Sequence, residues 1–396
     1  MDDWQKLLLS FFRSDLPVDV KFQLRDLNDG GWKSLLSLAA KHNVTPMLYK
    51  SLANLSHEIR VPPDLQIELR KAYHRSAARN MRLYQQLAGL LLKFKAEEIP
   101  VILLKGAHLA QIIYGNIALR PMGDIDLLVK DEDLSKASAA LFQQGYETSY
   151  EDAGRSLEHL PPFRKKGFFD VEIHFHIAAP PISGNFSVDE LWERSRKETV
   201  QGVNVLTLCP EDLLIHLCLH ATCHHIFDNG IRPLIDIYHT LNYFYEEFEW
   251  DAVITRSKHW KANKSLYVML ALSKKVLGAS VPDWVLEKII AVNPDVNVIE
   301  SAQRLVFEQE SPISLHVAKL MTADNWPERF RVFIDRAFPQ RELMLLHDIR
   351  DNKKFSFYKM YFSRLKGILK RHKRSIWETL LTGHGSSETL RIQKER

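Results

Sequence analysis

Cysteine is scarce in this chain of 396 residues, and long apolar runs are missing. Its three cysteines, Cys209, Cys218 and Cys223, form an odd set within one segment. Such a set argues against a disulfide framework and is typical of reduced thiols in a cytosolic protein. No apolar run reaches the roughly 20 residues that span a membrane. The first residues, Met-Asp-Asp-Trp-Gln-Lys, are acidic where a secretion signal is basic, so we expect a cytoplasmic protein.

A strong excess of charge is also lacking. The chain has 53 lysines and arginines against 49 aspartates and glutamates, a net charge of +4. This charge is too small to predict a protein that wraps nucleic acid. Apolar residues make up 45% and charged residues 26%, as in ordinary globular proteins, and the length suggests two or three domains. The function therefore has to be inferred from motifs.

The most informative stretch is Arg120-Pro-Met-Gly-Asp-Ile-Asp-Leu-Leu-Val, with Gly123 just before two spaced aspartates. Side chains alternate between the faces of a β-strand, so Asp124 and Asp126 should share one exposed face while the apolar residues enter a core. Carboxylate oxygens on a rigid strand suit Mg²⁺. The tripeptide by itself favours an edge strand that carries solvated acids, and only its context favours a metal site.

A strand end that precedes this motif offers a phosphate site. Pro100-Val-Ile-Leu-Leu-Lys is a short apolar run typical of a buried strand, and helical spacing resumes at Gly106. The helix N-terminus would present free backbone N–H groups to a phosphate. Gly106 lets the backbone approach a ligand, and Lys105 supplies a positive charge. Lys105 and Arg120 have a common alternative, which is an ion pair with an aspartate.

The segment 163–177 reads as a hairpin whose second arm alternates strictly between apolar and polar residues. Glu172, His174 and His176 fall on the polar face. Either histidine can contact a substrate or transfer a proton, and ordinary hydrogen-bonded strand histidines are the alternative.

Three acids on neighbouring strands of one small sheet can hold two cations about 3.5–4 Å apart, an arrangement that promotes in-line displacement at phosphorus. Asp124, Asp126 and Glu172 are such a set if their strands pair. The alternative is an ion-pair network that serves only the structure.

The chain resembles the uncharacterised nucleotidyltransferase family of the polymerase-β-like nucleotidyltransferase superfamily. The resemblance is carried by Leu104-Lys-Gly-Ala-His-Leu-Ala, the aspartate motif, Gly145-Tyr and Val171-Glu-Ile-His. It covers residues 96–180 most clearly. The segments that begin at Pro210 and Ile231 also resemble the helical part of the family.

The resemblance implies an α+β fold in which helical regions flank a small mixed β-sheet core of the nucleotidyltransferase type. We expect an N-terminal helical region at 1–95, an α/β core at 96–180, a C-terminal helical region at 181–345 and a basic amphipathic tail at 346–396. The helical spacing of apolar residues before residue 95 and after residue 211 fits this division.

The resemblance also implies a reaction, the transfer of a nucleoside monophosphate from an NTP to a hydroxyl or phosphate acceptor with release of pyrophosphate. Mg²⁺ or Mn²⁺ would be held by Asp124, Asp126 and Glu172, which are also the expected catalytic residues. The expected nucleotide contacts are Lys105, Gly106, Arg120 and Gly123.

One position departs from the superfamily pattern. Ala107 stands where serine or glycine is usual, which removes a hydroxyl that can bond to the triphosphate. The alternative function is therefore a catalytically degenerate nucleotide-binding protein or an antitoxin-like partner. No motif in the flanking helices identifies the acceptor.

A second group of metal ligands lies on an expected helix. His216, His220 and His224 recur every fourth residue, a spacing that stacks imidazoles on one face and can bind zinc. A zinc metalloenzyme, for example a phosphohydrolase, is thus a third hypothesis. The competing interpretation is buried histidines that bond toward the active site together with Arg232 and Asp236. On that interpretation His220 and Asp236 are candidate contacts to the acceptor.

The stretch 353–374 contains nine lysines and arginines, interleaved with aromatic residues, and no acid. Such a pattern fits contact with an anionic membrane surface or nucleic acid. A solvated helix that covers the domain with its apolar face is the alternative.

Overall fold

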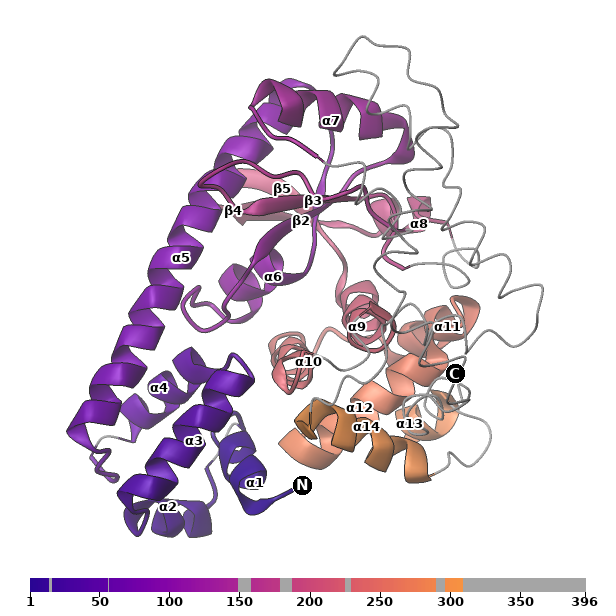
Figure 1. Cartoon of the computed structure of the whole chain (residues 1–396). Coiled ribbons are helices and arrows are strands. Elements are labelled where there is room, and N and C mark those ends of the chain that lie inside the picture. The colour runs from indigo at the N-terminus through magenta and orange to yellow at the C-terminus, as the bar shows by residue number, and fades with distance from the viewer. Residues whose placement is uncertain are drawn as a thin grey trace, which may run out of the picture.

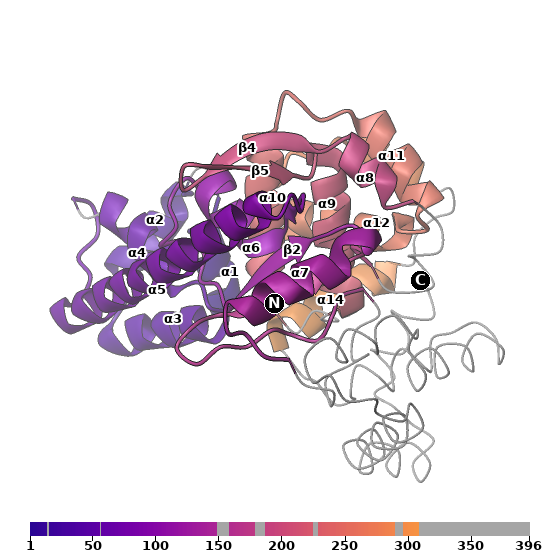
Figure 2. The same cartoon turned by 90° about the horizontal axis from the view of Figure 1, so that it is seen from above.

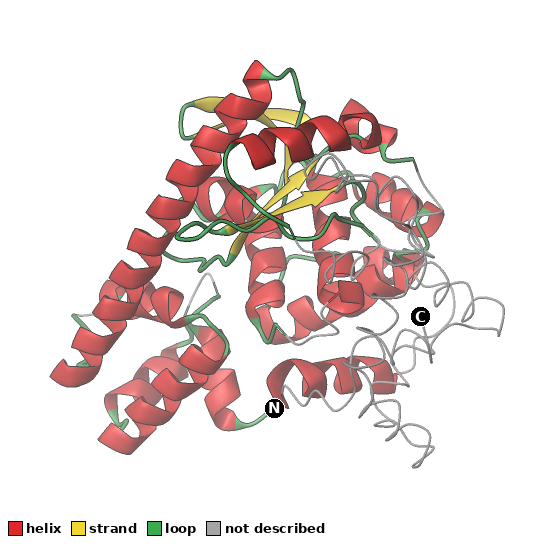
Figure 3. Cartoon of the chain, turned by 45° about the horizontal axis from the view of Figure 1, so that its top comes forward, coloured by secondary structure: helices red, strands yellow, loops and turns green. Residues whose placement is uncertain are grey.

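The computed structural model describes most of the first 308 residues. The described residues are 1–13, 16–55, 57–148, 158–178, 187–224, 229–289 and 296–308. The expected tail at 346–396 and the basic stretch at 353–374 lie outside them. Helices surround one five-stranded sheet (Figure 3), and the predicted α+β class is confirmed.

Helices form the N-terminal region, and short polar motifs begin two of them. Asp2 starts the first helix with a capping box: its carboxylate accepts from the backbone N–H of Gln5, whose side chain accepts from the backbone N–H of Asp2. Asn28 caps the third helix through its side-chain Oδ1, which accepts from the backbone N–H of Gly31. The helices are α1 (Asp3–Ser10), α2 (Val18–Arg25), α3 (Asp29–Lys41), α4 (Thr45–Asn54) and α5 (Pro63–Ala96). Helix α5 connects this region to the sheet (Figure 1).

The sheet is mixed, with strand order β3-β2-β1-β5-β4. β2 pairs with β3 in parallel and with β1 antiparallel, while β1 pairs with β5 in parallel. The strands are β1 (Ile102–Leu103), β2 (Asp124–Leu128), β3 (Asp170–His174), β4 (Arg196–Val200) and β5 (Val203–Thr207). The connections between β1 and β3 contain α6 (Lys105–His108), the π-helix η1 (Leu109–Ile113), the 3₁₀-helix η2 (Asp131–Asp133) and α7 (Leu134–Gln143).

The hairpin β4–β5 extends the sheet into the range 181–345, which we predicted to be helical. Its turn is Gln201-Gly202, and both residues have positive φ angles, 50° and 76°. Two positive φ angles in a two-residue loop match the twist of the flanking strands and favour a tight hairpin. β5 then pairs with β1, although about 100 residues separate the two strands in the chain. Local sequence patterns do not reveal such a distant pairing.

The two faces of the sheet are covered by different helices (Figures 1 and 2). Ile125, Leu127 and Ile173 pack into the apolar cluster that contains residues of α5 and α7. Ile102 and Leu128 point to the opposite face and join the larger cluster of the C-terminal helices. The alternation within β2 therefore directs Asp124 and Asp126 toward the C-terminal helices.

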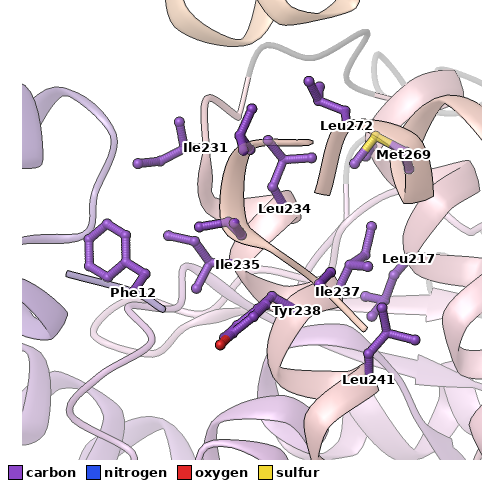
Figure 4. Packing of buried hydrophobic residues seen from close by; sticks show 14 of the residues in the cluster. Phe12, Leu217, Ile231, Leu234, Ile235, Ile237, Tyr238, Leu241, Met269 and Leu272 are labelled. Carbon is purple, nitrogen blue, oxygen red and sulfur yellow. The ribbon is translucent and has the colours of Figure 1, made fainter. Parts of the chain in front are cut away.

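The C-terminal region contains α8 (Asp189–Glu193), α9 (Pro210–Leu219), the π-helix η5 (His220–His224), α10 (Arg232–Tyr243), α11 (Trp250–His259), α12 (Asn263–Leu277), α13 (Asp283–Ile289) and α14 (Val296–Glu308). Apolar residues of α10, including Leu234 and Leu241, pack beside Leu217 of α9 and Met269 of α12 (Figure 4). Within the described residues, no helix is long and apolar enough to cross a membrane.

Candidate active site

The parallel pairing of β2 with β3 brings two of the expected acids together. Asp126 lies opposite Glu172 in the register, and Leu128 lies opposite His174. Glu172 is therefore on the same face of the sheet as Asp126. Asp124, two residues earlier, is at the exposed start of β2, whereas only 4% of Asp126 is exposed. The alternation predicted an exposed face for both aspartates, and for Asp126 this is wrong because Lys105 and His174 pack against it.

Asp126 accepts two hydrogen bonds on a single oxygen. Lys105 donates from Nζ to Oδ1 over 2.8 Å, and Nε2 of His174 lies 3.0 Å from the same oxygen. Lys105 Nζ is also 3.4 Å from His174 Nε2. Glu172 completes the group, with its Oε2 3.6 Å from His174 Nε2. The centre of the site is thus a compact cluster of two carboxylates, an imidazole and an ammonium group.

His159 belongs to this cluster, although the sequence patterns did not single it out. Its Nε2 is 3.9 Å from Glu172 Oε2, and its ring centroid is 4.9 Å from that of His174. His159 pairs with His174 across an isolated antiparallel bridge, and Phe163 pairs with Val171 across another. The two bridges are four positions apart on one side, from His159 to Phe163, and three positions apart on the other, from Val171 to His174. This one-residue irregularity, like a β-bulge, prevents simple alternation from placing His159 on the acidic face.

The charges in the cluster shift the pKa values of its members. The negative charge of Asp126 raises the pKa of Asp124 to about 6. Burial tends to raise the pKa of Asp126, but Lys105 and His174 outweigh burial and hold that pKa below its usual range. Burial likewise opposes the charge on Lys105, but Asp126 and Glu172 raise its pKa. Asp126 and Lys105 are therefore a charged pair at neutral pH.

Glu172 and His174 follow the same pattern. Burial favours the neutral forms of both. The nearby His174 nevertheless lowers the pKa of Glu172, and the contacts with Asp126 and Glu172 raise the pKa of His174. Glu172 is thus a carboxylate at neutral pH and able to accept a proton.

Lys105 and Gly106 begin α6, as the sequence predicted. Lys105 has a φ of 43°, in the left-handed region that residues with a Cβ seldom adopt. A Cβ added to Gly106 would lie 2.7 Å from Nη1 of Arg120 and 3.2 Å from the side chain of Met122. Glycine is therefore needed at position 106 for close packing. By contrast, a Cβ on Gly123 would meet no atom within 4 Å.

Arg120 and Asp236 bind each other, although the sequence indicated nucleotide contact for the first and acceptor contact for the second. Arg120 donates from Nε to Oδ1 over 2.8 Å and from Nη2 to Oδ2 over 2.9 Å. Tyr114 donates to Oδ1 over 2.8 Å. Both members of the pair are buried. Of the two alternatives for Arg120, the structure shows the ion pair, and its partner is on α10 and not on β2.

The remaining histidine candidates have other contacts. His176 follows β3, and its Nδ1 accepts a hydrogen bond from the backbone N–H of Ala178. His216 is buried in α9, with its ring centroid 6.2 Å from that of His220. The side chain of His224 lies outside the described residues, so the structure does not place the predicted zinc triad.

Among the side chains that the structure describes, one group can hold a metal ion. Asp126, Glu172 and His174 each offer one ligand atom, and these atoms lie within 4.8 Å of one another. Two of these residues, Asp126 and Glu172, are in the acidic trio that the sequence predicted. The third ligand is His174, which we expected to contact the substrate.

A family model described as "Uncharacterised nucleotidyltransferase" matches residues 28–278. The chain belongs to this family. The match covers more than half of the chain and confirms the resemblance. Nucleotidyltransferase is therefore its enzyme class, and an NTP is the substrate that the class implies. Comparisons with curated proteins and with solved structures found no match.

Proposed function

We propose that this nucleotidyltransferase is metal-dependent and transfers a nucleoside monophosphate from an NTP to a hydroxyl or phosphate oxygen. The observation that carries the proposal is the pairing of Asp126 with Glu172 across two parallel strands, with ligand atoms within 4.8 Å of each other and of His174. Divalent ions of the Mg²⁺ and Mn²⁺ type prefer carboxylate oxygens, and imidazole adds affinity for transition metals.

The donor set fits such an ion. Asp126 and Glu172 supply charged oxygens at neutral pH, and Asp124 lies one alternation away on the same face. His174 can provide a nitrogen when its imidazole is deprotonated, and Mn²⁺ accepts nitrogen ligands more readily than Mg²⁺ does. A bound divalent ion neutralises phosphate charge and activates the attacking oxygen.

The residues around the ion have distinct roles in the proposal. The acceptor oxygen forms a bond to the α-phosphorus of the NTP, the bond from that phosphorus to the α–β bridging oxygen breaks, and pyrophosphate leaves. Where the acceptor is a hydroxyl, Glu172 takes its proton. Lys105 and the backbone N–H of Gly106 contact the phosphates, and Gly123 leaves open space beside the aspartates. Arg120, whose Nη1 lies next to Gly106, supports this segment through Asp236.

The experiment uses purified protein, each labelled NTP in turn, Mg²⁺ or Mn²⁺, and a metabolite extract as the source of acceptor. We expect release of pyrophosphate by the wild type and a loss of at least 100-fold in Asp126→Asn, because that variant removes a charged ligand. Asp64→Asn, which changes an exposed acid in the first turn of α5, is the matched control. Equal activity in Asp126→Asn and the wild type would refute the proposed site.

The alternative is a catalytically degenerate nucleotide-binding or antitoxin-like protein, which the sequence suggested through Ala107. In the structure, only 1% of Ala107 is exposed, and it packs in the apolar cluster below β2. A hydroxyl at position 107 would therefore enter the core. This observation favours the enzyme, and calorimetry with Mg-NTP distinguishes the two functions: tight binding without pyrophosphate release would support the alternative.

A further inference from the structure

The ammonium group of Lys105 and a metal ion would compete for the same carboxylate group, that of Asp126. Lys105 Nζ lies 2.8 Å from Oδ1 of Asp126 and 3.4 Å from Nε2 of His174. Asp126 and His174 are two of the three residues of the metal-binding group. Only 9% of Lys105 is exposed, so water does little to screen its charge.

We propose that Lys105 is an exchangeable counter-ion, whose ammonium group neutralises Asp126 until an NTP binds and then moves to the triphosphate as the metal ion enters. This inference rests on the proposed function, because it takes a divalent ion and an NTP as the ligands of the site.

Like charges provide the first argument. A divalent ion binds a carboxylate oxygen at about 2.0–2.6 Å. The carboxylate of Asp126 already accepts from an ammonium group 2.8 Å away. Two cations on one buried carboxylate repel each other strongly, so the ion and Lys105 should exclude each other unless an anion is added to Asp126 and Glu172.

The position of Lys105 provides the second argument. It is the first residue of α6 and directly precedes Gly106, the expected site of phosphate contact. Lysine carries its charge on a flexible four-carbon stem, so the ammonium group can change partners while the backbone stays in place. The contacts described for its Nζ are with Asp126 and His174. A triphosphate next to Gly106 would supply this additional anion.

The consequence is a thermodynamic coupling between metal and nucleotide. Metal alone must displace Lys105 and should bind weakly. Metal together with NTP should bind well, because the phosphates receive the displaced ammonium group. A ligand that removes a competing contact raises the affinity for the other ligand, and the effect is reciprocal.

The test measures binding of Mn²⁺ alone, by electron paramagnetic resonance of the free ion, to the wild type and to Lys105→Met. We expect the variant to bind Mn²⁺ at least 10-fold more tightly and a non-hydrolysable NTP analogue at least 10-fold more weakly. Opposite signs distinguish exchange from general damage to the site, which would weaken both. Lys130→Met is the matched control: Lys130 follows β2, and its Nζ lies over the ring of Trp192. It should leave both affinities unchanged.

The analogue itself carries phosphates that bind Mn²⁺, so the decisive quantity is the difference in coupling between proteins. The analogue should raise the Mn²⁺ affinity of the wild type by a larger factor than that of Lys105→Met. Equal or weaker binding of Mn²⁺ alone by the variant would overturn the inference. If the variant does not fold, NMR of wild-type protein with ¹³Cε-labelled lysine is used. The Lys105 signal should then move with Mg²⁺ plus analogue and stay in place with Mg²⁺ alone, and the absence of this difference would overturn the inference.

These measurements do not depend on turnover. Opposite shifts in Lys105→Met without any release of pyrophosphate would support the exchange and refute the proposed reaction. Release of pyrophosphate with unchanged Mn²⁺ affinity in Lys105→Met would do the reverse.

Discussion

The buried pair of Arg120 and Asp236 joins the segment that carries the aspartates to helix α10. Two parallel hydrogen bonds of 2.8 and 2.9 Å connect the guanidinium group to the carboxylate, and Tyr114 donates to the same carboxylate. Asp236→Asn keeps the size of the side chain but leaves Arg120 buried without a counter-charge. Removing one partner of a buried ion pair destabilises a protein by about 3–5 kcal/mol, and we expect a decrease of this order in the free energy of unfolding.

The assay is denaturant unfolding, followed by circular dichroism and by tryptophan fluorescence, at pH 7. The double variant Arg120→Met with Asp236→Leu removes both charges and should be more stable than Asp236→Asn, because no unpaired charge remains. Asp251→Asn is the matched control. It breaks the exposed pair between Lys288 and Asp251 and should change the free energy by less than about 1 kcal/mol.

Two results would refute this reasoning. One is a loss in Asp236→Asn no greater than that in the exposed control. The other is a double variant that is less stable than Asp236→Asn, which would mean that the pair contributes more than the removal of a single buried charge explains.

Two further predictions concern stability. Gly106→Ala should destabilise the protein by about 1–3 kcal/mol, because its Cβ would press on Arg120, which Asp236 holds in place. Gly123→Ala has open space around its Cβ and should change the free energy of unfolding by less than about 0.5 kcal/mol in the same denaturant assay. Equal effects of the two substitutions would contradict the steric argument. Burial, with a smaller effect from Lys41, lowers the pKa of His42 to about 4. The folded state therefore keeps His42 neutral, whereas the unfolded chain binds a proton at this residue below pH 6.5. As the pH drops from 6.5 to 4, His42 should by itself lower the free energy of unfolding by about 3 kcal/mol. His42→Gln should reduce this slope, and an unchanged slope would contradict the assignment.

The sequence by itself determined those features that depend on local periodicity and on special residues. The alternation in the two acid-bearing strands correctly placed Asp126 and Glu172 on one face of the sheet and the apolar residues between them and their neighbours on the other, since the side chains of a strand alternate between its faces. Gly145 was enough to end α7, with a φ of 81°. The run of motifs from Leu104 to His174 was sufficient to identify the family.

The tertiary structure alone decided which polar groups meet. Three contacts join residues that are not neighbours in any local pattern: the irregular bridge between His159 and His174, the ion pair of Arg120 with Asp236, and the pairing of β5 with β1. The buried contact between Asp126 and Lys105 likewise joins residues that are distant in the sequence. Side-chain partners across a folded core depend on strand register and helix packing, which no local repeat in the sequence specifies.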